Sequence, residues 1–392
     1  MKPLSSPLPW GTLTGIRPSK VAEKLLTAGE SAGAVLEILK RKYFVLPDRA
    51  TLCLETAQES IRLKKSLPKK SIALYIGIPF CPTRCAYCSF VSNSVERSDT
   101  FVEPFATTLI NEIAMFSEIV KELGLSVITV YIGGGTPTSL PDSILETVMS
   151  ALIKSFDFTD LREYTVEAGR PDTITAGKLK IITAYGANRI CINPQSMSAE
   201  VLGAIGRNHT PEDVDKAVKL VRKTSAVLNM DVIAGLPSDT FEGFKKTLDT
   251  VIGFAPENIT VHTLSLKKGS RIMLENTVIP AGEEVGKMLD YASLQLRESG
   301  YAPYYVYRQK YISGGFENTG WSLKGYEGVY NSCMMDELCT VLALGAGGVT
   351  KLVTTDGRIE RIFNAKFPRE YIMMTEKINE KVGRIRENAI SI

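Results

Sequence analysis

The chain has 392 residues, of which 44% are hydrophobic and 23% are charged, and its formal net charge is +3. That composition is typical of a globular protein with room for one large domain and a smaller one. The near-neutral charge argues against a nucleic-acid partner, and the apolar runs are far shorter than the about 20 residues of a membrane span. Since no apolar signal core follows Met1, we expect a cytoplasmic protein.

The seven cysteines are unevenly spread along the chain. Three lie within the eight residues 81–88, whereas Cys53, Cys191, Cys333 and Cys339 are scattered. A secreted disulfide framework would distribute its cysteines in pairs, so the pattern indicates a reducing compartment and a metal site. With only two histidines, the chain has too few for a His-rich site.

Residues 1–70 are predicted to be largely helical, with apolar patches at 20–26 and 34–39. From residue 72, apolar runs of strand and helix character alternate. The expected strands cover 72–78, 127–132, 163–168, 188–192, 229–234 and 259–264, and the expected helices cover 101–123, 144–153, 176–184, 211–225 and 241–254.

Six strand–helix units in succession predict a parallel β/α architecture. A dinucleotide-binding fold is not indicated, because no phosphate-binding glycine pattern follows the first strand. Polar and glycine residues instead recur after the carboxyl ends of several strands, as in a β/α barrel. We therefore predict an α/β fold built on a partial, six-unit TIM-like barrel over 71–279. A helical segment over 1–70 precedes it, and a smaller α+β domain over 280–392, where the alternation is lost, follows it.

The segment Cys81-Pro-Thr-Arg-Cys85-Ala-Tyr-Cys88 comes directly after the first strand. Thiolates are the usual ligands of iron–sulfur clusters, and three of them would leave one iron of a four-iron cluster without a protein ligand. A structural zinc normally needs four ligands, and no fourth Cys or His lies nearby. At these residues the chain resembles the radical-SAM superfamily. That resemblance implies a 4Fe–4S cluster whose open iron chelates S-adenosylmethionine (SAM), which is cleaved reductively to methionine and a 5′-deoxyadenosyl radical.

The second expected strand ends in Gly133-Gly-Gly-Thr-Pro-Thr138. Glycines permit close backbone approach to a ligand, although a triplet alone is also compatible with a plain turn. In the family that the chain resembles, this segment binds the amino group of SAM.

Further segments extend the resemblance, in chain order, to the oxygen-independent coproporphyrinogen III oxidase family. They are 75–81, 165–168, 188–195, 205–208 and 229–237. By position, Tyr75, Gly134 and Glu167 match residues that contact the first, cluster-bound SAM. Tyr87, Gly135, Thr136, Gln195, Arg207 and Asp231 match residues of a second SAM site. A solvated strand end or a helix cap remains the alternative interpretation of the two acids.

The remaining segments point to one branch of that family. Residues 9–18, 304–310, 317–318 and 344–347 resemble the coproporphyrinogen dehydrogenase branch known as HemZ. The chain departs from the oxidase proper, which often has a fourth cysteine where Phe90 stands and a histidine where Gly77 stands. The haem-chaperone (HemW) signature His-Asn-x-x-Tyr-Trp is replaced by Tyr330-Asn-Ser-Cys-Met-Met335. A haem chaperone and an anaerobic haem-degrading methyltransferase remain alternatives.

The resemblance implies a tetrapyrrole substrate with four propionates and a low-potential electron donor such as flavodoxin or ferredoxin. Cations at Lys267, Lys268, Arg271, Arg308 and Lys310 and tyrosines at Tyr301, Tyr304, Tyr305, Tyr307 and Tyr311 are candidates for the substrate pocket. Alternating tyrosines are equally expected in a half-buried strand, and lysines are usually solvated. The predicted reaction is the oxidative decarboxylation of two propionates to vinyl groups, which gives protoporphyrinogen IX.

Overall fold

The computed structural model describes residues 8–15, 17–88, 93–94, 99–267, 269–354 and 358–388. Phe90 and Lys268, singled out in the sequence, lie outside these ranges. The chain divides into two compact units, each made of three segments. Unit 1 comprises Met1–Ser66, Gln195–Ile205 and Met230–Asp336, and unit 2 comprises Leu67–Pro194, Gly206–Asn229 and Glu337–Ile392. The domain boundaries expected after residues 70 and 279 remain predictions about sequence organisation.

Unit 2 contains the first four strand–helix repeats and the end of the chain. Its elements are β1 (Ser71–Ile78), β2 (Phe80–Cys81), β3 (Asn93–Ser94), α4 (Asp99–Glu122), β4 (Ser126–Gly134), the 3₁₀ turn η2 (Pro137–Ser139), α5 (Asp142–Ser155), β5 (Glu163–Glu167), the 3₁₀ turn η3 (Pro171–Thr173), α6 (Ala176–Ala184), β6 (Arg189–Gln195), α8 (Pro211–Val221), β11 (Thr340–Gly345), β12 (Val349–Val353), β13 (Ile359–Phe363), α13 (Pro368–Ile372) and α14 (Thr375–Asn388). Gln195, the last residue of β6, already belongs to unit 1.

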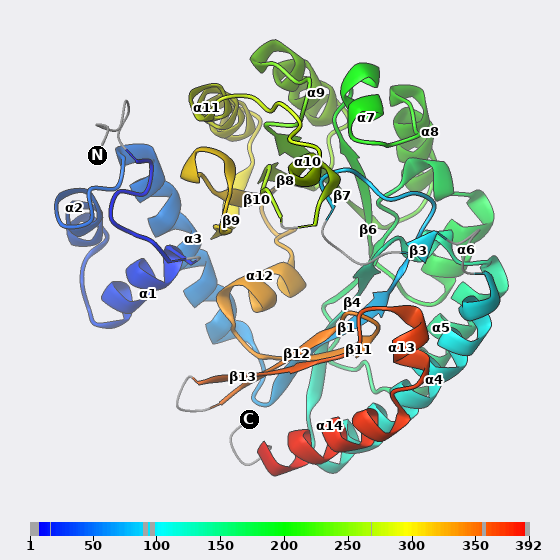
Figure 1. The fold of residues 1–392 in the computed structure, drawn as a ribbon. Coiled ribbons are helices and arrows are strands. Elements are labelled where there is room, and N and C mark those ends of the chain that lie inside the picture. Colours follow the sequence, from blue (N-terminus) through cyan, green and yellow to red (C-terminus); the bar gives the residue numbers. More distant parts are fainter. Residues whose placement is uncertain are drawn as a thin grey trace. The chain divides into compact units, whose positions relative to one another are not determined.

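The sheet of unit 2 has the strand order β13-β12-β11-β1-β4-β5-β6, followed by the start of β7 (Val227–Ala234). Strands β11, β1, β4, β5 and β6 run parallel. Every residue of β6 and of β11 is buried, as expected for parallel strands covered on both faces. Strand β11 comes from the end of the chain yet pairs with β1, the strand that precedes the cysteines (Figure 1).

Local signals in the sequence start several helices of unit 2. Thr210 forms a capping box with Asp213 at the start of α8, and Pro211 occupies its first turn. The Thr175 hydroxyl accepts a bond from the Lys178 N–H at the start of α6. These caps satisfy backbone N–H groups that have no partner inside the helix.

Helices α13 and α14 pack on α4 and attach the end of the chain to unit 2 (Figure 1). Their contact contains the Glu112 cluster, which we define as Glu112, Asn364, Tyr371 and Lys381. Glu112 is fully buried, accepts a 2.8 Å bond from the Gly345 N–H and a 2.5 Å bond from the Tyr371 hydroxyl, and pairs with Lys381 at 3.2 Å. Asn364 bonds both Glu112 and Lys381.

Unit 1 contains the N-terminal helices and the later repeats. Its elements are α1 (Ser19–Thr27), α2 (Ala32–Arg41), α3 (Pro47–Ser66), α7 (Ala199–Ala204), the end of β7, α9 (Phe241–Gly253), β8 (Asn258–Thr263), α10 (Arg271–Leu274), α11 (Gly282–Glu298), β9 (Ala302–Tyr307), the 3₁₀ turn η4 (Ser313–Gly315), β10 (Asn318–Ser322) and α12 (Val329–Asp336). The strand order is β7-β8-β10-β9, and β10 runs antiparallel to both of its neighbours.

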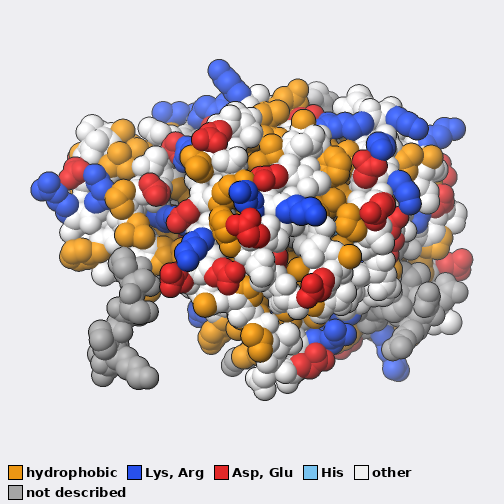
Figure 2. Space-filling view, turned by 90° about the horizontal axis from the view of Figure 1, so that it is seen from above, with side chains coloured by type: hydrophobic (Ala, Val, Ile, Leu, Met, Phe, Trp, Pro, Cys, Tyr) orange, Lys and Arg blue, Asp and Glu red, His pale blue; other side chains and the backbone are white. Residues whose placement is uncertain are grey.

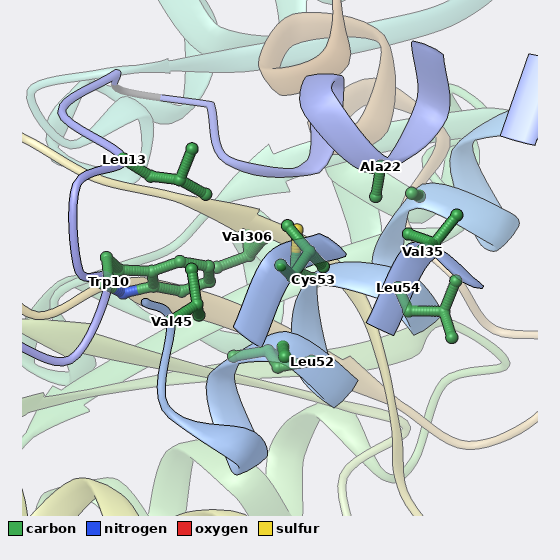
Figure 3. Close-up of a cluster of buried hydrophobic side chains, with 12 residues drawn as sticks. Trp10, Leu13, Ala22, Val35, Val45, Leu52, Cys53, Leu54 and Val306 are labelled. Atoms are coloured by element: carbon green, nitrogen blue, oxygen red, sulfur yellow. The ribbon is translucent and has the colours of Figure 1, made fainter. Parts of the chain in front are cut away.

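The predicted helical character of the N-terminal segment is confirmed by α1, α2 and α3. An apolar cluster joins them to β9 and includes Trp10, Val35, Cys53 and Val306, all fully buried (Figure 3). The Trp10 indole N–H donates to Glu317 Oε2 at 2.7 Å, so a polar bond anchors the ring as well. On the face drawn in Figure 2, positive and negative side chains are interspersed.

Each of the six predicted strands and five predicted helices from residue 72 to residue 264 has a counterpart in the structure. The largest differences are at ends: α8 stops at Val221 rather than 225, and β6 continues to Gln195 instead of ending at 192. Strand ends are hard to predict where every residue is buried, because the alternation of apolar and polar residues disappears.

Candidate radical-SAM site

The cluster loop, which we define as residues 81–88, follows β1 in unit 2. Cys81, Cys85 and Cys88 form no disulfide and are half-buried, and the Cys88 N–H closes a turn by donating to the Cys85 carbonyl at 3.1 Å. Among the described residues, no three His, Cys, Asp or Glu side chains converge as they would around a single metal ion. The thiolates of an iron–sulfur cluster bind separate iron atoms and need no common focus.

The glycine segment at the end of β4 lies directly against the start of the cluster loop. The Gly135 and Thr136 N–H groups each donate a 2.6 Å bond, to the Ile78 and Phe80 carbonyls, respectively. Thr136 Oγ1 lies 3.4 Å from Cys81 Sγ. A Cβ atom at Gly135 would lie 2.3 Å from the Phe80 carbonyl oxygen and 3.0 Å from Cys81 Sγ. Only glycine permits this approach.

Tyr75, Gly134 and Glu167, expected at a first SAM site, lie close together. In the sheet register, Tyr75 stands beside Tyr131, and their rings stack at 6.3 Å. The Tyr131 hydroxyl donates to Glu167 Oε1. A Cβ atom at Gly134 would lie 3.3 Å from the Tyr75 hydroxyl, and the φ angle of Gly134 is +105°. Burial, with a smaller contribution from Glu167, raises the pKa of Tyr75.

Sequence reasoning missed Tyr131 as a site residue. It is the third residue before Gly134 in β4, and the parallel register places it between Tyr75 of β1 and Thr165 of β5. The signal was a polar aromatic residue within a largely apolar strand, but only the structure shows that it reaches Glu167.

Arg207, expected at a second SAM site, lies near Tyr87 and Cys85. It is 8% exposed and donates to the Gly169 and Asn193 carbonyls at 3.1 and 2.5 Å. Burial disfavours its charge, but Tyr87 and Cys85 hold the pKa of Arg207 above its usual value. The pKa of Tyr87 is raised chiefly by burial, against the opposing effect of Arg207.

The surroundings of Arg207 contain buried polar atoms that have no hydrogen-bond partner among the described residues. They are Arg207 Nε, Asn193 Oδ1 and the two ring nitrogens of His209, which make no well-aligned hydrogen bond although the Pro194 carbonyl lies near the ring; we call these three residues the Arg207 cluster. Buried polar atoms are nearly always satisfied, so such orphans indicate a place for a ligand or water. Three thiols in one loop, a close glycine segment and an incompletely paired guanidinium fit a thiolate-bound anionic cluster with a small charged ligand.

The other two predicted SAM contacts, Gln195 and Asp231, lie in unit 1. Gln195 is buried with a φ angle of 66°, a conformation unusual for a residue other than glycine, and its Oε1 has no partner among the described residues. Asp231 Oδ2 lies 3.4 Å from His262 Nε2. The charge of Asp231 also acts on Tyr307: burial, with a smaller contribution from Asp231, raises the pKa of Tyr307 to about 12, while a bond with Gln309 opposes the shift.

The residues considered for a substrate pocket have mixed surroundings. Tyr301 and Tyr304 are buried, and the Tyr301 hydroxyl donates to the Pro256 carbonyl, whereas Tyr311 is 64% exposed. Arg308 bonds the backbone carbonyls of Leu13 and Gly315. Three of these side chains therefore contribute to the packing of unit 1.

Comparison with known proteins identifies the family. Residues 75–251 match the model of the Radical SAM superfamily. The oxygen-independent coproporphyrinogen-III oxidase-like protein HemZ of Bacillus subtilis is 40% identical over 369 residues, which are 92% of this chain and 74% of that protein. The chain belongs to this radical-SAM family. Its membership implies a 4Fe–4S cluster and SAM.

Two further relatives bear on the fold and on the function. The haem chaperone HemW of Escherichia coli is 27% identical over 77% of this chain and 75% of its own length. The crystallised coproporphyrinogen III oxidase HemN of E. coli superposes with a TM-score of 0.62 at 20% identity, over 82% of this chain and 73% of that one. The prediction of an α/β fold with a partial barrel is confirmed. Within the described residues, no helix is long and apolar enough to cross a membrane.

Proposed function

We propose that this protein oxidatively decarboxylates two propionate side chains of coproporphyrinogen III to vinyl groups, giving protoporphyrinogen IX. The supporting observation is its 40% identity, over 92% of its length, to a protein named as oxygen-independent coproporphyrinogen-III oxidase-like. In the overall conversion, each propionate loses a hydrogen atom from its β-carbon, one molecule of CO₂ and one electron. The electron acceptor and a low-potential donor such as flavodoxin or ferredoxin would be separate molecules.

The cofactor-binding residues proposed here divide into three groups. Cys81, Cys85 and Cys88 would ligate the cluster; Tyr75, Gly134 and Glu167 would contact one SAM; and Tyr87, Gly135, Thr136, Gln195, Arg207 and Asp231 would contact a second. When bound, the cluster and SAM together supply a 5′-deoxyadenosyl radical and methionine. One or two SAM molecules are compatible with this set.

The side chains of unit 2 have distinct roles in this proposal. Tyr131 orients the Glu167 carboxylate, which is suited to accept hydrogen bonds from nucleoside hydroxyls. Arg207 is a buried cation near Cys85 and offers a partner for a ligand carboxylate. Gly135 keeps the glycine segment against Cys81.

Haem carriage is the second candidate function, because HemW chaperones are relatives over most of the chain. A carrier would bind haem without converting it, whereas the proposed enzyme would release a vinyl product. The two functions therefore differ in what happens to the tetrapyrrole.

The deciding experiment is anaerobic incubation of the reconstituted protein with SAM, reductant and either coproporphyrinogen III or haem. We expect protoporphyrinogen IX and 5′-deoxyadenosine from the first mixture. Stoichiometric haem binding without a vinyl product would contradict the proposal and support a carrier. Loss of the haem Soret band with SAM and reductant would instead indicate a haem-degrading methyltransferase.

The variant Cys85→Ala tests the cluster assignment, and Cys53→Ala is its matched control. Cys53 is buried in the apolar cluster of unit 1, and burial raises the pKa of its thiol to about 12. Cys85→Ala removes a cluster ligand and should lower 5′-deoxyadenosine formation by at least about a hundredfold. Only a thiolate binds iron, and Cys53 stays protonated, so Cys53→Ala should keep the activity of the folded protein. Undiminished SAM cleavage by Cys85→Ala would refute the cluster assignment.

A further inference from the structure

A second buried arginine in unit 2 contacts the cluster loop directly. Arg170 follows β5 and precedes η3, and its side chain is almost inaccessible to solvent. Its Nη1 atom donates to Thr83 Oγ1 at 2.9 Å and lies 3.5 Å from the Thr83 carbonyl oxygen. Thr83 lies midway between Cys81 and Cys85, so this contact fixes the middle of the segment that separates two thiols.

The Arg170 guanidinium is itself held in place. Its Nε and Nη2 atoms donate to the two carboxylate oxygens of Asp172 at 3.1 and 3.0 Å, a forked arrangement with fixed geometry. The Arg170 carbonyl accepts a 2.8 Å bond from Thr173, whose hydroxyl also bonds Thr138 of η2 at 2.6 Å. The 3₁₀ turns after β4 and β5 therefore form one hydrogen-bonded support.

Arg170 differs from Arg207 in that its charge is paired with a carboxylate. Asp172 pairs with Arg170, whereas the contacts of Arg207 are carbonyls, Tyr87 and Cys85. A guanidinium paired with a carboxylate exerts only a weak net field on its surroundings. Its effect on the loop is therefore geometric.

The Thr83 hydroxyl connects Arg170 to a further segment of unit 2. While it accepts the bond from Arg170, it donates to the Gly206 carbonyl at 3.4 Å. Gly206 is adjacent to Arg207, so the hydroxyl links the support behind β5 to the segment that carries the second arginine. The shorter of its two bonds is the one from Arg170.

We propose that Arg170 is a positioning residue for the cluster loop: by holding Thr83 against η3, it presets the arrangement of the Cys81 and Cys85 thiols. Outer groups that orient metal ligands commonly matter ten- to about a hundredfold for metal affinity or activity. The role does not depend on which tetrapyrrole is the substrate. Its test therefore stands apart from the test of the proposed function.

The test uses Thr83→Val, which replaces the hydroxyl by a methyl group and leaves the Arg170–Asp172 pair in place. We expect hydrogen–deuterium exchange at residues 81–88 to rise about tenfold in both the cluster-free and the reconstituted protein. The EPR spectrum of the reduced cluster should change in its response to SAM, and the kcat of substrate-free SAM cleavage should fall about tenfold. Thr83→Ser should restore all three readouts.

Arg189→Lys is the matched control. Arg189 is also a buried arginine of unit 2, and it pairs with Glu163 at 3.4 Å, but both residues lie at the starts of their strands, away from the cluster loop. This variant should lose stability while keeping loop exchange and the EPR response. Equal changes in Arg189→Lys, or unchanged loop exchange and EPR response in Thr83→Val, would overturn the proposal. Additive effects of Thr83→Val and Arg170→Lys in the double variant would do the same, because contacting partners should be coupled.

Discussion

The Glu112 and Arg207 clusters of unit 2 are both buried and both contain a cation, but they differ in hydrogen bonding. In the Glu112 cluster, the Lys381 ammonium has three acceptors: Glu112, Asn364 and the Ala343 carbonyl. In the Arg207 cluster, Arg207 Nε, both His209 nitrogens and Asn193 Oδ1 make no well-aligned hydrogen bond among the described residues.

The difference distinguishes a structural role from a binding role. A satisfied network in a low-dielectric interior resists change, because removal of one member leaves the others buried without a partner. An unsatisfied network has a cost in the free protein that a ligand would relieve. The Glu112 cluster therefore has the hydrogen bonding of a structural network, and the unsatisfied atoms of the Arg207 cluster support its place in the proposed site.

The largest effect on stability is expected from Lys381→Met. Removal of the ammonium leaves the Glu112 carboxylate fully buried without its cation, so the free energy of unfolding should fall by about 3–5 kcal/mol. Urea denaturation monitored by circular dichroism measures the change. Lys377→Met on the exposed side of α14 is the control and should stay within about 0.5 kcal/mol of the wild type. A comparable loss in both variants would show that the Glu112 cluster has no special role.

An intermediate effect is expected from His209. Burial, followed by the nearby Arg207 and Arg170 guanidiniums, lowers its pKa to about 4, while Asp172 and the Pro194 carbonyl oppose the shift weakly. His209 therefore becomes protonated near pH 6.5 in the unfolded chain but only near pH 4 in the folded chain.

The sign of this dependence follows directly. The contribution of neutral His209 to stability is complete above about pH 6.5 and is lost as the pH falls toward 4, by on the order of 3 kcal/mol. Denaturation midpoints at several pH values in this window, compared between wild type and His209→Gln, measure it. Parallel pH profiles of the two proteins would show that His209 is not buried in its neutral form.

The smallest effect on stability is expected from Arg207→Met. The variant loses two bonds to carbonyls and the contacts with Tyr87 and Cys85, but it also removes a buried charge with an orphaned Nε, so the unfolding free energy should change by no more than about 1 kcal/mol. SAM cleavage should nevertheless fall by about a hundredfold, as judged by 5′-deoxyadenosine formation. If Arg207→Met lost as much stability as Lys381→Met, the Arg207 cluster would serve mainly to stabilise the fold, as the Glu112 cluster does.

Local patterns predicted most of the elements and part of the site. The three cysteines were recognisable from their spacing and the glycine segment from its place after a strand, whereas Tyr75 and Glu167 were proposed only from their positions in segments that resemble the family. The structure brings Tyr75, Gly134, Glu167, Cys81 and Thr136 together as a connected group.

Contacts between distant segments were not recognisable in the same way. Tyr131 and Arg170 lie in the repeats themselves, but their roles depend on the register of β1 with β4 and on the path of the cluster loop. The periodicity of one segment does not predict these roles, because each role depends on which residue of a neighbouring strand or loop lies beside Tyr131 or Arg170.

The sequence by itself determined the order of strands and helices from residue 72 to residue 264, the thiol-bearing loop and the family, because these follow from local spacing and residue type. Only the tertiary structure decided that β11, from the end of the chain, pairs with β1, and that Glu112 and Lys381, 269 residues apart, share one buried cluster. Only the tertiary structure, likewise, showed that Arg170 is paired with the Asp172 carboxylate, whereas the contacts of Arg207 are carbonyls, Tyr87 and Cys85. Burial and pairing of charge depend on the groups that packing brings together, and those groups are distant in the sequence.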